Sequence, residues 1–575
     1  MPSEKLRSAR WFEGDNEVAL LHRVALRSAG ATVDSSATRP VIGIAHSASE
    51  LNPCNMPLKD LAEAARAGVV AAGGIPVVFS TFSLGEDLMK PSAMLYRNLL
   101  AMELEETLRS YPLDGALFLA NCDKTVPASV MAAVSADLPS IVVTGGTRKP
   151  AHFKGRRIGT GTDLWRVWEE RRSGLVDDES WREFERSLTC GLGACNTMGT
   201  AATMAILVEA MGLSLPGTSA APAGTAERVE AARKSGERVV EMVGEGLRPS
   251  ALLTKASFSN AIRVLNALGG STNAVIHLTA IAGRAGIALD LEDFSRLGRD
   301  VPVLADVEPT GEGLIPDLHE SGGLPALLAE IAGLLELDAK TVSGTLGSAV
   351  KAASVRGRAI RSSKQPLRRN GAFVVLKGNL APDGAVVRTS TASPELFSHE
   401  GPAVVFDGYE DMQRRIDQPN PHLDETSVLV LRGCGPVGGP GMPEWGMIPI
   451  PSALARRGVR DMVRVTDARM SGTSYGTVML HVAPEAAIGG PLALVHDGDA
   501  IRVDVEKGSL DLLVAEDELE RRRAKWAPTP GPDIRGWVAL YRSHVTQAPR
   551  GCDLDFLEAP TPAHRVVVEP VVGRS

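Results

Sequence analysis

The chain has 575 residues and a formal net charge of −8, with 44% hydrophobic, 23% charged and 4% aromatic residues. This acidic balance excludes nucleic acid and an anionic membrane surface as the main partner, because no basic stripe interleaved with aromatic residues is present. A chain of this length exceeds what one hydrophobic core holds together, so we expect two large domains and a small-molecule ligand.

The first 17 residues are charged throughout and contain no apolar run of the kind found in secretory signals. We therefore expect the protein to stay in the cytoplasm. The longest uncharged stretch, residues 187–208, is long enough to span a bilayer, but its Gly, Thr, Asn and Cys content argues against a membrane span.

Between residues 40 and 215, short apolar runs alternate with helical stretches. The apolar runs are residues 40–46, 75–81, 115–120 and 140–146, and the helical stretches between them are residues 58–73, 94–110 and 129–136. This alternation predicts βαβ units around a mostly parallel sheet. Ligands bind beyond the carboxyl ends of the strands in such sheets, so the loops after the apolar runs form the expected site.

Residues 225–370 have a helical pattern that ends in a basic loop. A nucleic-acid patch is one interpretation of this loop, and a solvated interdomain linker is the favoured one. From there on, β-rich segments alternate with Gly, Pro and Asp turns, at residues 372–380, 384–390, 402–408, 427–435, 462–470 and 492–505. This pattern predicts a barrel or sandwich with a few helices. The predicted fold is therefore α/β, with a mostly parallel-sheet domain at residues 1–370 and a β-barrel-like domain at residues 371–575.

Three of the six cysteines, Cys54, Cys122 and Cys195, stand in loops bounded by Gly, Asn and Pro. They are far apart in sequence and match no zinc-finger or ferredoxin spacing, and each taken singly is more simply a buried inert cysteine. Their neighbours, however, are poor core formers, and their positions at strand ends or a helix start would let soft ligands converge on iron. Three thiolates would leave one iron of an iron–sulfur cluster free to act as a Lewis acid.

Acidic residues near these loops could give oxygen ligands to Mg²⁺: Asp123, Glu86 and Glu444. Each acid alone is more often a helix cap or a surface charge. Lys124, next to Asp123, would be repelled by a dication unless its amine were neutral or converted into an anionic carbamate. A carbamate would turn this lysine into a further oxygen ligand.

Ser471 and Thr473 lie in a Gly-flanked loop after the strand-like run "MVRV". The loop is not a G-x-S-x-G elbow, and no histidine stands near it in sequence to complete a triad. An ordinary turn is one interpretation. The other is a serine whose alkoxide is stabilised by a metal or cluster and which then acts as the base toward a carbon acid.

Eight segments carry a resemblance to a known family. They are "SELNPCN", "NCDKTVPA", "LPSIVVTGG", "ACNTMGTA", "GGSTNAVIHL", "GNLAPDGAV", "GPGMPEWG" and "TDARMSGTSYGT". In this order, from about residue 38 to 560, the chain resembles the dihydroxy-acid, phosphogluconate and sugar-acid dehydratases. The resemblance implies an N-terminal α/β domain, a C-terminal β-barrel-like domain, and an active site between them at the interface of a homodimer, which could pair into a homotetramer.

The resemblance also implies the cofactors and the roles of the site residues. An iron–sulfur cluster, expected to be of the two-iron two-sulfur type, would be bound by Cys54, Cys122 and Cys195. Mg²⁺ would be bound by Glu86, Asp123, Glu444 and a carbamylated Lys124. Ser471 would be the base, assisted by Thr473, while Cys190, Cys434 and Cys552 have no matching role.

The implied reaction is dehydration of a 2,3-dihydroxy acid to a 2-keto-3-deoxy acid. The segments "CNTMGTA" and "DARMSGT" resemble the pentonate and hexonate dehydratases, so we expect a sugar acid such as arabinonate or xylonate. The segment "PCNMPLKDLAEA" is also close to the dihydroxy-acid dehydratases of branched-chain amino acid biosynthesis, which remain the alternative. A non-catalytic iron–sulfur sensor would need a DNA-binding or partner-binding module, and the sequence shows none.

Overall fold

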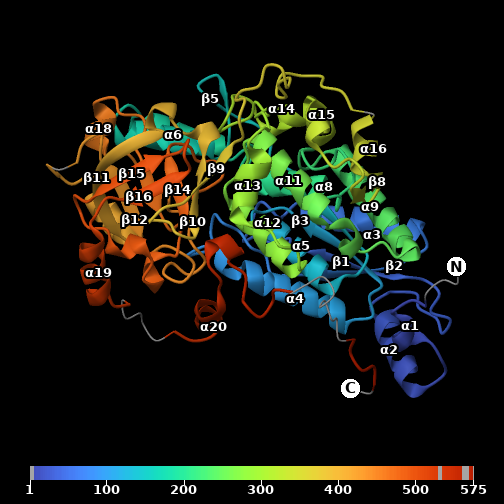
Figure 1. The fold of residues 1–575 in the computed structure, drawn as a ribbon. Helices are drawn as coiled ribbons and strands as arrows, with labels where there is room; N and C mark the ends of the chain where they lie inside the picture. Colours follow the sequence, from blue (N-terminus) through green and yellow to red (C-terminus); the bar gives the residue numbers. More distant parts are fainter. Residues whose placement is uncertain (1–4, 352, 422, 529–533, 560–568, 574–575) are drawn as a thin grey trace.

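The computed structural model describes residues 5–351, 353–421, 423–528, 534–559 and 569–573. Two bodies lie side by side in it (Figure 1). The first holds a small parallel sheet surrounded by helices, and the second is built around an eight-stranded sheet. This arrangement confirms the predicted fold class.

The first sheet has four parallel strands in the order β2-β1-β3-β4. They are β1 (Val41–His46), β2 (Ile75–Ser80), β3 (Gly115–Ala120) and β4 (Ser140–Thr144), joined by α3 (Leu58–Ala71), η1 (Ala93–Tyr96), α4 (Arg97–Ser110) and α5 (Thr125–Ala136). The strands are rich in Val and Ile, and β3 and β4 are buried along their whole length, as expected of a sheet covered by helices on both faces. The βαβ prediction is correct for each of these strands and helices.

Further helices complete the first body. They are α1 (Ala9–Phe12), α2 (Glu17–Ser28), α8 (Thr200–Ala210), α9 (Ala226–Glu245), α10 (Pro249–Leu252), α11 (Lys255–Leu268), α12 (Asn273–Arg284), α13 (Leu291–Gly298), α14 (Ile315–Glu320), α15 (Gly323–Glu330), η2 (Ala332–Leu334) and α16 (Leu346–Lys351), with a short hairpin of β7 (Lys340–Thr341) and β8 (Gly344–Thr345). Every residue of α8 is buried. None of the helices in the described ranges has both the length and the apolar character needed to cross a bilayer.

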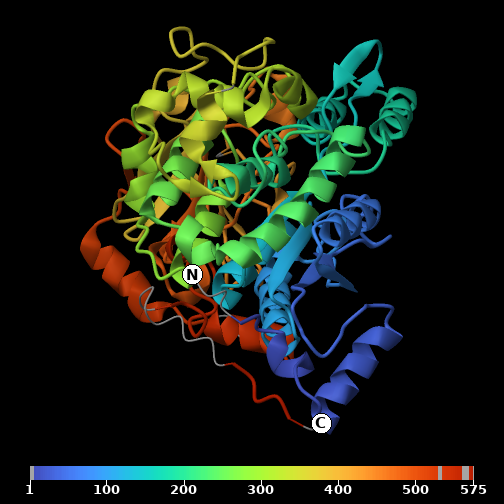
Figure 2. The same ribbon diagram turned by 90° about the vertical axis from the view of Figure 1, so that its right-hand side faces the viewer.

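A small unit is inserted between β4 and α8. It consists of the hairpin β5 (Ala151–Phe153) and β6 (Arg156–Ile158), followed by α6 (Thr162–Arg172) and α7 (Asp178–Leu188). Its own small core contains Phe184 and Val167. The unit stands out from the first body in Figure 2, and α6 lies against the second body in Figure 1. Sequence patterns did not single it out.

The second sheet runs in the order β16-β15-β11-β12-β13-β14-β10-β9. Its strands are β9 (Phe373–Leu376), β10 (Gly384–Arg388), β11 (Ser398–Asp407), β12 (Val428–Arg432), β13 (Arg464–Thr466), β14 (Val478–Ala483), β15 (Ala500–Asp504) and β16 (Ser509–Leu512). The backbone of Lys377, just after β9, bonds to Gly508 at 2.8 Å and to Leu510 at 3.0 Å, so the two edges meet and the barrel is nearly closed. Strands β14 and β16 were missed in the sequence.

Short helices lie in the connections of this barrel, and the chain then returns to the first body. The helices are η3 (Thr389–Thr391), η4 (Pro394–Leu396), α17 (Tyr409–Arg415), α18 (Ser452–Arg456), η5 (Ala486–Ile488), η6 (Pro491–Leu494), α19 (Glu516–Lys525), α20 (Trp537–His544) and η7 (Ala548–Arg550). The indole of Trp537 in α20 donates to the Leu95 carbonyl at 2.8 Å. The buried Arg284 of α12 forms an ion pair with Asp553 at 2.7 Å. These contacts bind the C-terminal segment to the helices of the first body.

Candidate active site

Three cysteines converge at the carboxyl ends of the first sheet. Cys54 lies in the turns after β1, and Cys122 is the second residue after β3, the neighbouring parallel strand. Both are buried, and Cys122 is close enough to Cys54 to raise its pKa. The Asn55 side chain accepts from the Cys122 amide at 3.0 Å, and the Asn121 side chain donates to the Cys54 carbonyl at 2.7 Å. These asparagines bind the two loops together.

Cys195 completes the group from the loop before α8. It is close enough for its charge to act on Cys54 and for that of Cys122 to act on it. Desolvation by the surrounding protein raises the pKa of Cys195 to about 12, and interaction with the Cys122 side chain followed by burial raises the pKa of Cys54. The guanidinium of Arg148 lies 3.8 Å from the Cys54 sulfur. Three convergent soft sulfur donors beside a fixed cation fit an iron–sulfur cluster, which would stabilise their thiolates.

Three carboxylates meet next to the thiols. Glu86 lies in the loop after β2, Asp123 follows Cys122, and Glu444 comes from the second body. One oxygen of each carboxylate lies within 4.8 Å of the others. Burial raises the pKa of Asp123 to about 6, and the charges of Glu444 and Glu86 add to this effect. The cluster brings Glu444 together with two acids more than 300 positions away in the sequence. Their role as Mg²⁺ ligands stays a prediction.

The Lys124 amine occupies the centre of these carboxylates. Its Nζ lies 3.3 Å from Glu86 Oε2, 3.4 Å from Asp123 Oδ2 and 3.4 Å from Glu444 Oε1, and the side chain is fully buried. Burial by itself lowers the pKa of Lys124, but the carboxylates outweigh it and the pKa is raised. The structure therefore presents Lys124 as a buried ammonium surrounded by anions.

The three carboxylates are chemically suited to Mg²⁺. Their oxygens are hard donors of the kind Mg²⁺ prefers. Glu86 Oε2 is buried without a hydrogen bond and forms an ion pair with the Lys124 amine at 3.3 Å. An ammonium and a dication would compete for the same three carboxylates, so Mg²⁺ binding here would require Lys124 to lose its positive charge.

Two residues that sequence patterns did not assign bind Glu444 directly. Asn273 donates to Glu444 Oε1 at 2.6 Å and to Thr200 at 2.8 Å, and Arg469 donates to the same Glu444 oxygen at 2.7 Å. Burial alone would raise the pKa of Glu444, but Lys124 and Arg469 outweigh it and lower the pKa. Asn273 and Arg469 both stand in segments that carried the family resemblance, but no spacing rule connects them with residue 444.

The loop of Ser471 packs closely against the start of α8 and the turn before α12. A Cβ on Gly472 would lie 2.7 Å from the Thr200 nitrogen and 2.7 Å from the Ser271 Cβ, so only glycine allows this close approach. The Ser471 and Thr473 hydroxyls lie 2.9 Å apart. Ser471 is partly exposed, while Thr473 is buried. The serine is thus available to a ligand, and the threonine is held behind it.

A buried arginine lies beneath this loop. Arg388, the last residue of β10, donates to the carbonyls of Gly472 at 2.8 Å and Gly270 at 3.2 Å, and also to the Ser474 carbonyl. Burial lowers its pKa to about 9. Across the described ranges, no carboxylate lies within ion-pair distance of its guanidinium. This cation therefore joins the loop of Ser471 to the turn that precedes Asn273.

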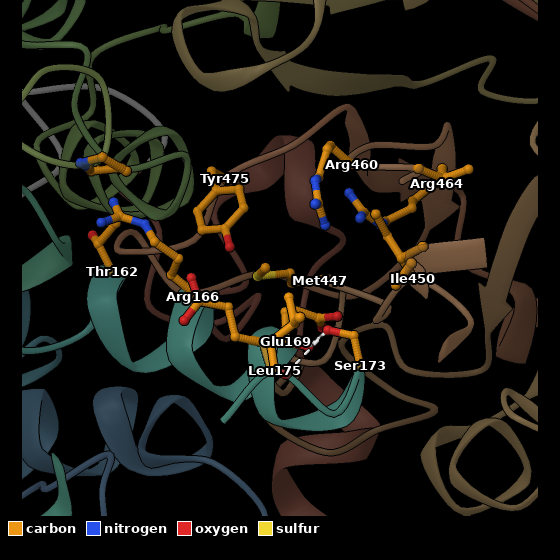
Figure 3. Close-up of a pocket in the computed structure, with 14 residues that line it drawn as sticks. Thr162, Arg166, Glu169, Ser173, Leu175, Met447, Ile450, Arg460, Arg464 and Tyr475 are labelled. Carbon is orange, nitrogen blue, oxygen red and sulfur yellow. Dashed lines mark hydrogen bonds between the residues drawn. The ribbon is translucent and has the colours of Figure 1, made fainter. Parts of the chain in front are cut away.

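A cavity of about 560 Å³ adjoins the loop (Figure 3). Tyr475 lies two residues after Thr473, and Met447 lies three residues after Glu444, so the cavity is lined by the segments that carry both residues, although neither the three thiols nor the three clustered carboxylates line it themselves. Its other lining residues are mostly polar or charged and include Thr162, Arg166, Glu169, Glu170, Ser173, Arg460 and Arg464. In Figure 3, Tyr475 and Arg166 lie near Thr162 at one end of the cavity, while Arg460 and Arg464 line the other.

Comparison with protein families agrees with this geometry. Residues 39–349 match the N-terminal domain of the dihydroxy-acid/6-phosphogluconate dehydratases, and residues 358–552 match their C-terminal domain. The chain belongs to this family. It is therefore a dehydratase, a hydro-lyase that removes water from its substrate, and the resemblance stated from the sequence is confirmed.

Relatives within the family have sugar acids and dihydroxy acids in their names. The 6-deoxy-6-sulfo-D-gluconate dehydratase of Pseudomonas putida is 46% identical over 97% of both chains. The L-arabinonate dehydratase of Rhizobium leguminosarum bv. trifolii is 46% identical over 96% of both chains. The dihydroxy-acid dehydratase of Caldanaerobacter subterraneus subsp. tengcongensis is 40% identical over 92% of this chain and 96% of its own.

Proposed function

We propose that this dehydratase converts a sugar acid, a C5 or C6 aldonate, into its 2-keto-3-deoxy acid. The observation that carries the proposal is the convergence of three thiols, three carboxylates and the Ser471 loop, beside a cavity whose lining includes several charged and hydroxyl-bearing side chains. The hydroxyls of an aldonate need polar partners, whereas the methyl groups of a branched dihydroxy acid need an apolar wall. Because an unpaired buried polar group costs about 1 to 3 kcal/mol, one pocket rarely serves both substrates equally well.

Cys54, Cys122 and Cys195 would bind an iron–sulfur cluster, of the two-iron two-sulfur type, and Glu86, Asp123 and Glu444 would bind Mg²⁺. When bound, these groups supply Lewis-acid polarisation of the substrate's oxygens. Lys124 joins the oxygen ligands as a carbamate, which removes the ammonium that now competes for the carboxylates. Density for the added carboxyl group, or activity that rises with bicarbonate, tests this step, and an unmodified Lys124 turned away from Mg²⁺ in active enzyme would contradict it.

The protein's own residues account for the proton transfer. Ser471, as its alkoxide, removes the proton from C2. The hydroxyl on C3 leaves and takes up a proton equivalent to the one that Ser471 removed, which forms water and restores the base, and the resulting enol tautomerises to the 2-keto acid. Thr473 assists by its hydrogen bond to the serine. Asn273 and Arg469 hold Glu444 in place, and the polar cavity binds the far hydroxyls of the substrate.

A substrate panel tests the proposal. With reconstituted cluster and Mg²⁺, we expect kcat/KM to be highest on a C5 or C6 aldonate and much lower on 2,3-dihydroxyisovalerate. A clear preference for dihydroxyisovalerate would overturn the sugar-acid proposal while leaving the dehydratase chemistry in place. Tyr475→Phe and Arg166→Gln variants should lower kcat/KM on long aldonates more than on the shortest, because their side chains line the cavity.

The dihydroxy-acid alternative is supported by the 40% identity to such an enzyme over nearly the whole chain. The cytoplasmic location and the assembly into a homodimer or homotetramer stay predictions from the sequence. Sedimentation of the purified holoenzyme would test the oligomeric state directly.

A further inference from the structure

We propose that Trp165 of α6 is a positioning residue that directs the Thr473 hydroxyl toward Ser471. The indole Nε1 of Trp165 lies 2.9 Å from Thr473 Oγ1, and Thr473 Oγ1 lies 2.9 Å from Ser471 Oγ. The three groups form one hydrogen-bonded chain that leads from the inserted unit to the proposed base. The inference rests on the proposed role of Ser471 and assigns a function to a residue outside the sequence motifs.

The direction of the chain follows from the chemistry of its first member. An indole N–H donates and cannot accept, so it uses a lone pair of the threonine oxygen. The threonine proton then needs an acceptor, and the Ser471 oxygen is the remaining partner of this hydroxyl among the described residues. The geometry of the Ser471–Thr473 pair lets either hydroxyl donate, and we assign Thr473 as the donor because Ser471 is the acceptor within reach of its proton. The proton of Ser471 is then free to point away.

This direction favours the deprotonated serine. A hydroxyl that donates to an alkoxide forms a charge-assisted bond, which is shorter and stronger than the bond to a neutral hydroxyl. The Thr473 amide adds a weaker contact to the same oxygen at 3.4 Å. Without the indole, Thr473 could rotate and accept the serine proton, an arrangement that would hold Ser471 in its neutral form.

The start of α6 is built to keep Thr473 in this position. Thr162 donates its hydroxyl to the Thr473 carbonyl at 2.9 Å. Gly161 has a φ of +117°, and a Cβ there would lie 2.6 Å from Thr473 Cγ2, so a side chain at this position would displace the threonine. Three successive contacts, at Gly161, Thr162 and Trp165, therefore fix one threonine.

A double-mutant cycle in the cluster-loaded, Mg²⁺-containing enzyme tests the proposal. Trp165→Phe keeps the ring and removes the N–H, and we expect kcat and the rate of C2 proton exchange each to fall about tenfold with KM within about twofold. In a Thr473→Val background, the same change should alter kcat by less than about twofold, because the chain is already broken. Trp168→Phe, on the exposed side of the same helix, is the matched control and should match the wild type.

Other outcomes overturn the proposal. Additive losses in the double mutant would show that Trp165 acts apart from Thr473, and a rise in KM with unchanged kcat would make the indole a substrate contact. Thr473→Ser, which keeps the hydroxyl, should retain turnover within about threefold, and a loss as large as that of Thr473→Val would also contradict the relay. Turnover and exchange at wild-type rates in Ser471→Ala would refute the proposed base itself, a failure distinct from that of Trp165.

Discussion

Replacing Arg388 with methionine would remove the buried cation beneath the Ser471 loop while keeping a long side chain in its place. The guanidinium donates to three main-chain carbonyls, at Gly270, Gly472 and Ser474, and to the Thr391 hydroxyl at 3.0 Å. The side chain is fully buried. The substitution therefore tests what a buried charge contributes to the position of a catalytic loop.

Two opposing terms set the effect on global stability. Three carbonyls left without a donor cost about 1 to 3 kcal/mol each, or about 3 to 9 kcal/mol together. Burial lowers the arginine pKa from 12.5 to about 9. This shift corresponds to a cost of about 5 kcal/mol for burying the charged guanidinium, and the methionine variant avoids that cost. The terms largely cancel, so we expect a change in the free energy of unfolding between a gain of about 2 and a loss of about 4 kcal/mol.

The effect on turnover should be larger, because the lost bonds flank the proposed base. Gly472 and Ser474 are held by Arg388 on either side of Thr473. A displacement of about 1 Å in catalytic groups costs about 100-fold in rate, and we expect a fall in kcat of that order with the cluster retained. Urea unfolding, iron content and steady-state kinetics on the best substrate measure the three quantities.

Arg23→Met is the matched control for this experiment. Arg23 is also buried and donates to main-chain carbonyls, those of Phe12 and Gly14, but it lies in α2 at the far end of the first body. This variant should change stability without changing kcat. Turnover of Arg388→Met within about threefold of the wild type, or an equal loss in Arg23→Met, would refute the reasoning.

Three further predictions concern the thiols, the base and a buried acid. Cys122→Ser should lose iron and visible absorbance. Cys552→Ser, which changes a buried thiol that is not one of the three proposed cluster ligands, should keep both. Full iron content in Cys122→Ser would contradict the assignment. Ser471→Ala should retain the cluster but lose turnover and C2 proton exchange, and wild-type exchange would point to another base. Burial, reinforced by the charge of Glu485, raises the pKa of Asp467 from 3.8 to about 7. The contribution of protonated Asp467 to stability is therefore complete below about pH 4 and is lost as the pH rises through about 7. The free energy of unfolding falls by at most about 1.4 kcal/mol per pH unit over this range. The Tm of Asp467→Asn should accordingly fall less than that of the wild type between about pH 5 and pH 8, and parallel curves would rule out this titration.

Local patterns in the sequence account for much of the fold. The alternation of apolar runs and helical stretches placed β1 to β4 and their connecting helices, because period and length are properties of neighbouring residues. Strands β14 and β16 were missed for related reasons: β14 (Val478–Ala483) follows directly on the Gly-rich loop of Ser471, and β16 (Ser509–Leu512) has four residues. A run that short has too weak a pattern to be separated from a turn.

The sequence by itself determined which loops carry thiols, acids and the serine, since those residue types and their Gly, Asn and Pro neighbours can be read directly. Only the tertiary structure decided which side chains support them. Arg388, Asn273 and Trp165 act through contacts with residues 84, 171 and 308 positions away, and no local period encodes a contact at such a separation. Packing of the inserted unit against the barrel, and of the barrel's loops against the helices of the first body, creates these contacts, because burial leaves each donor few acceptors to choose from.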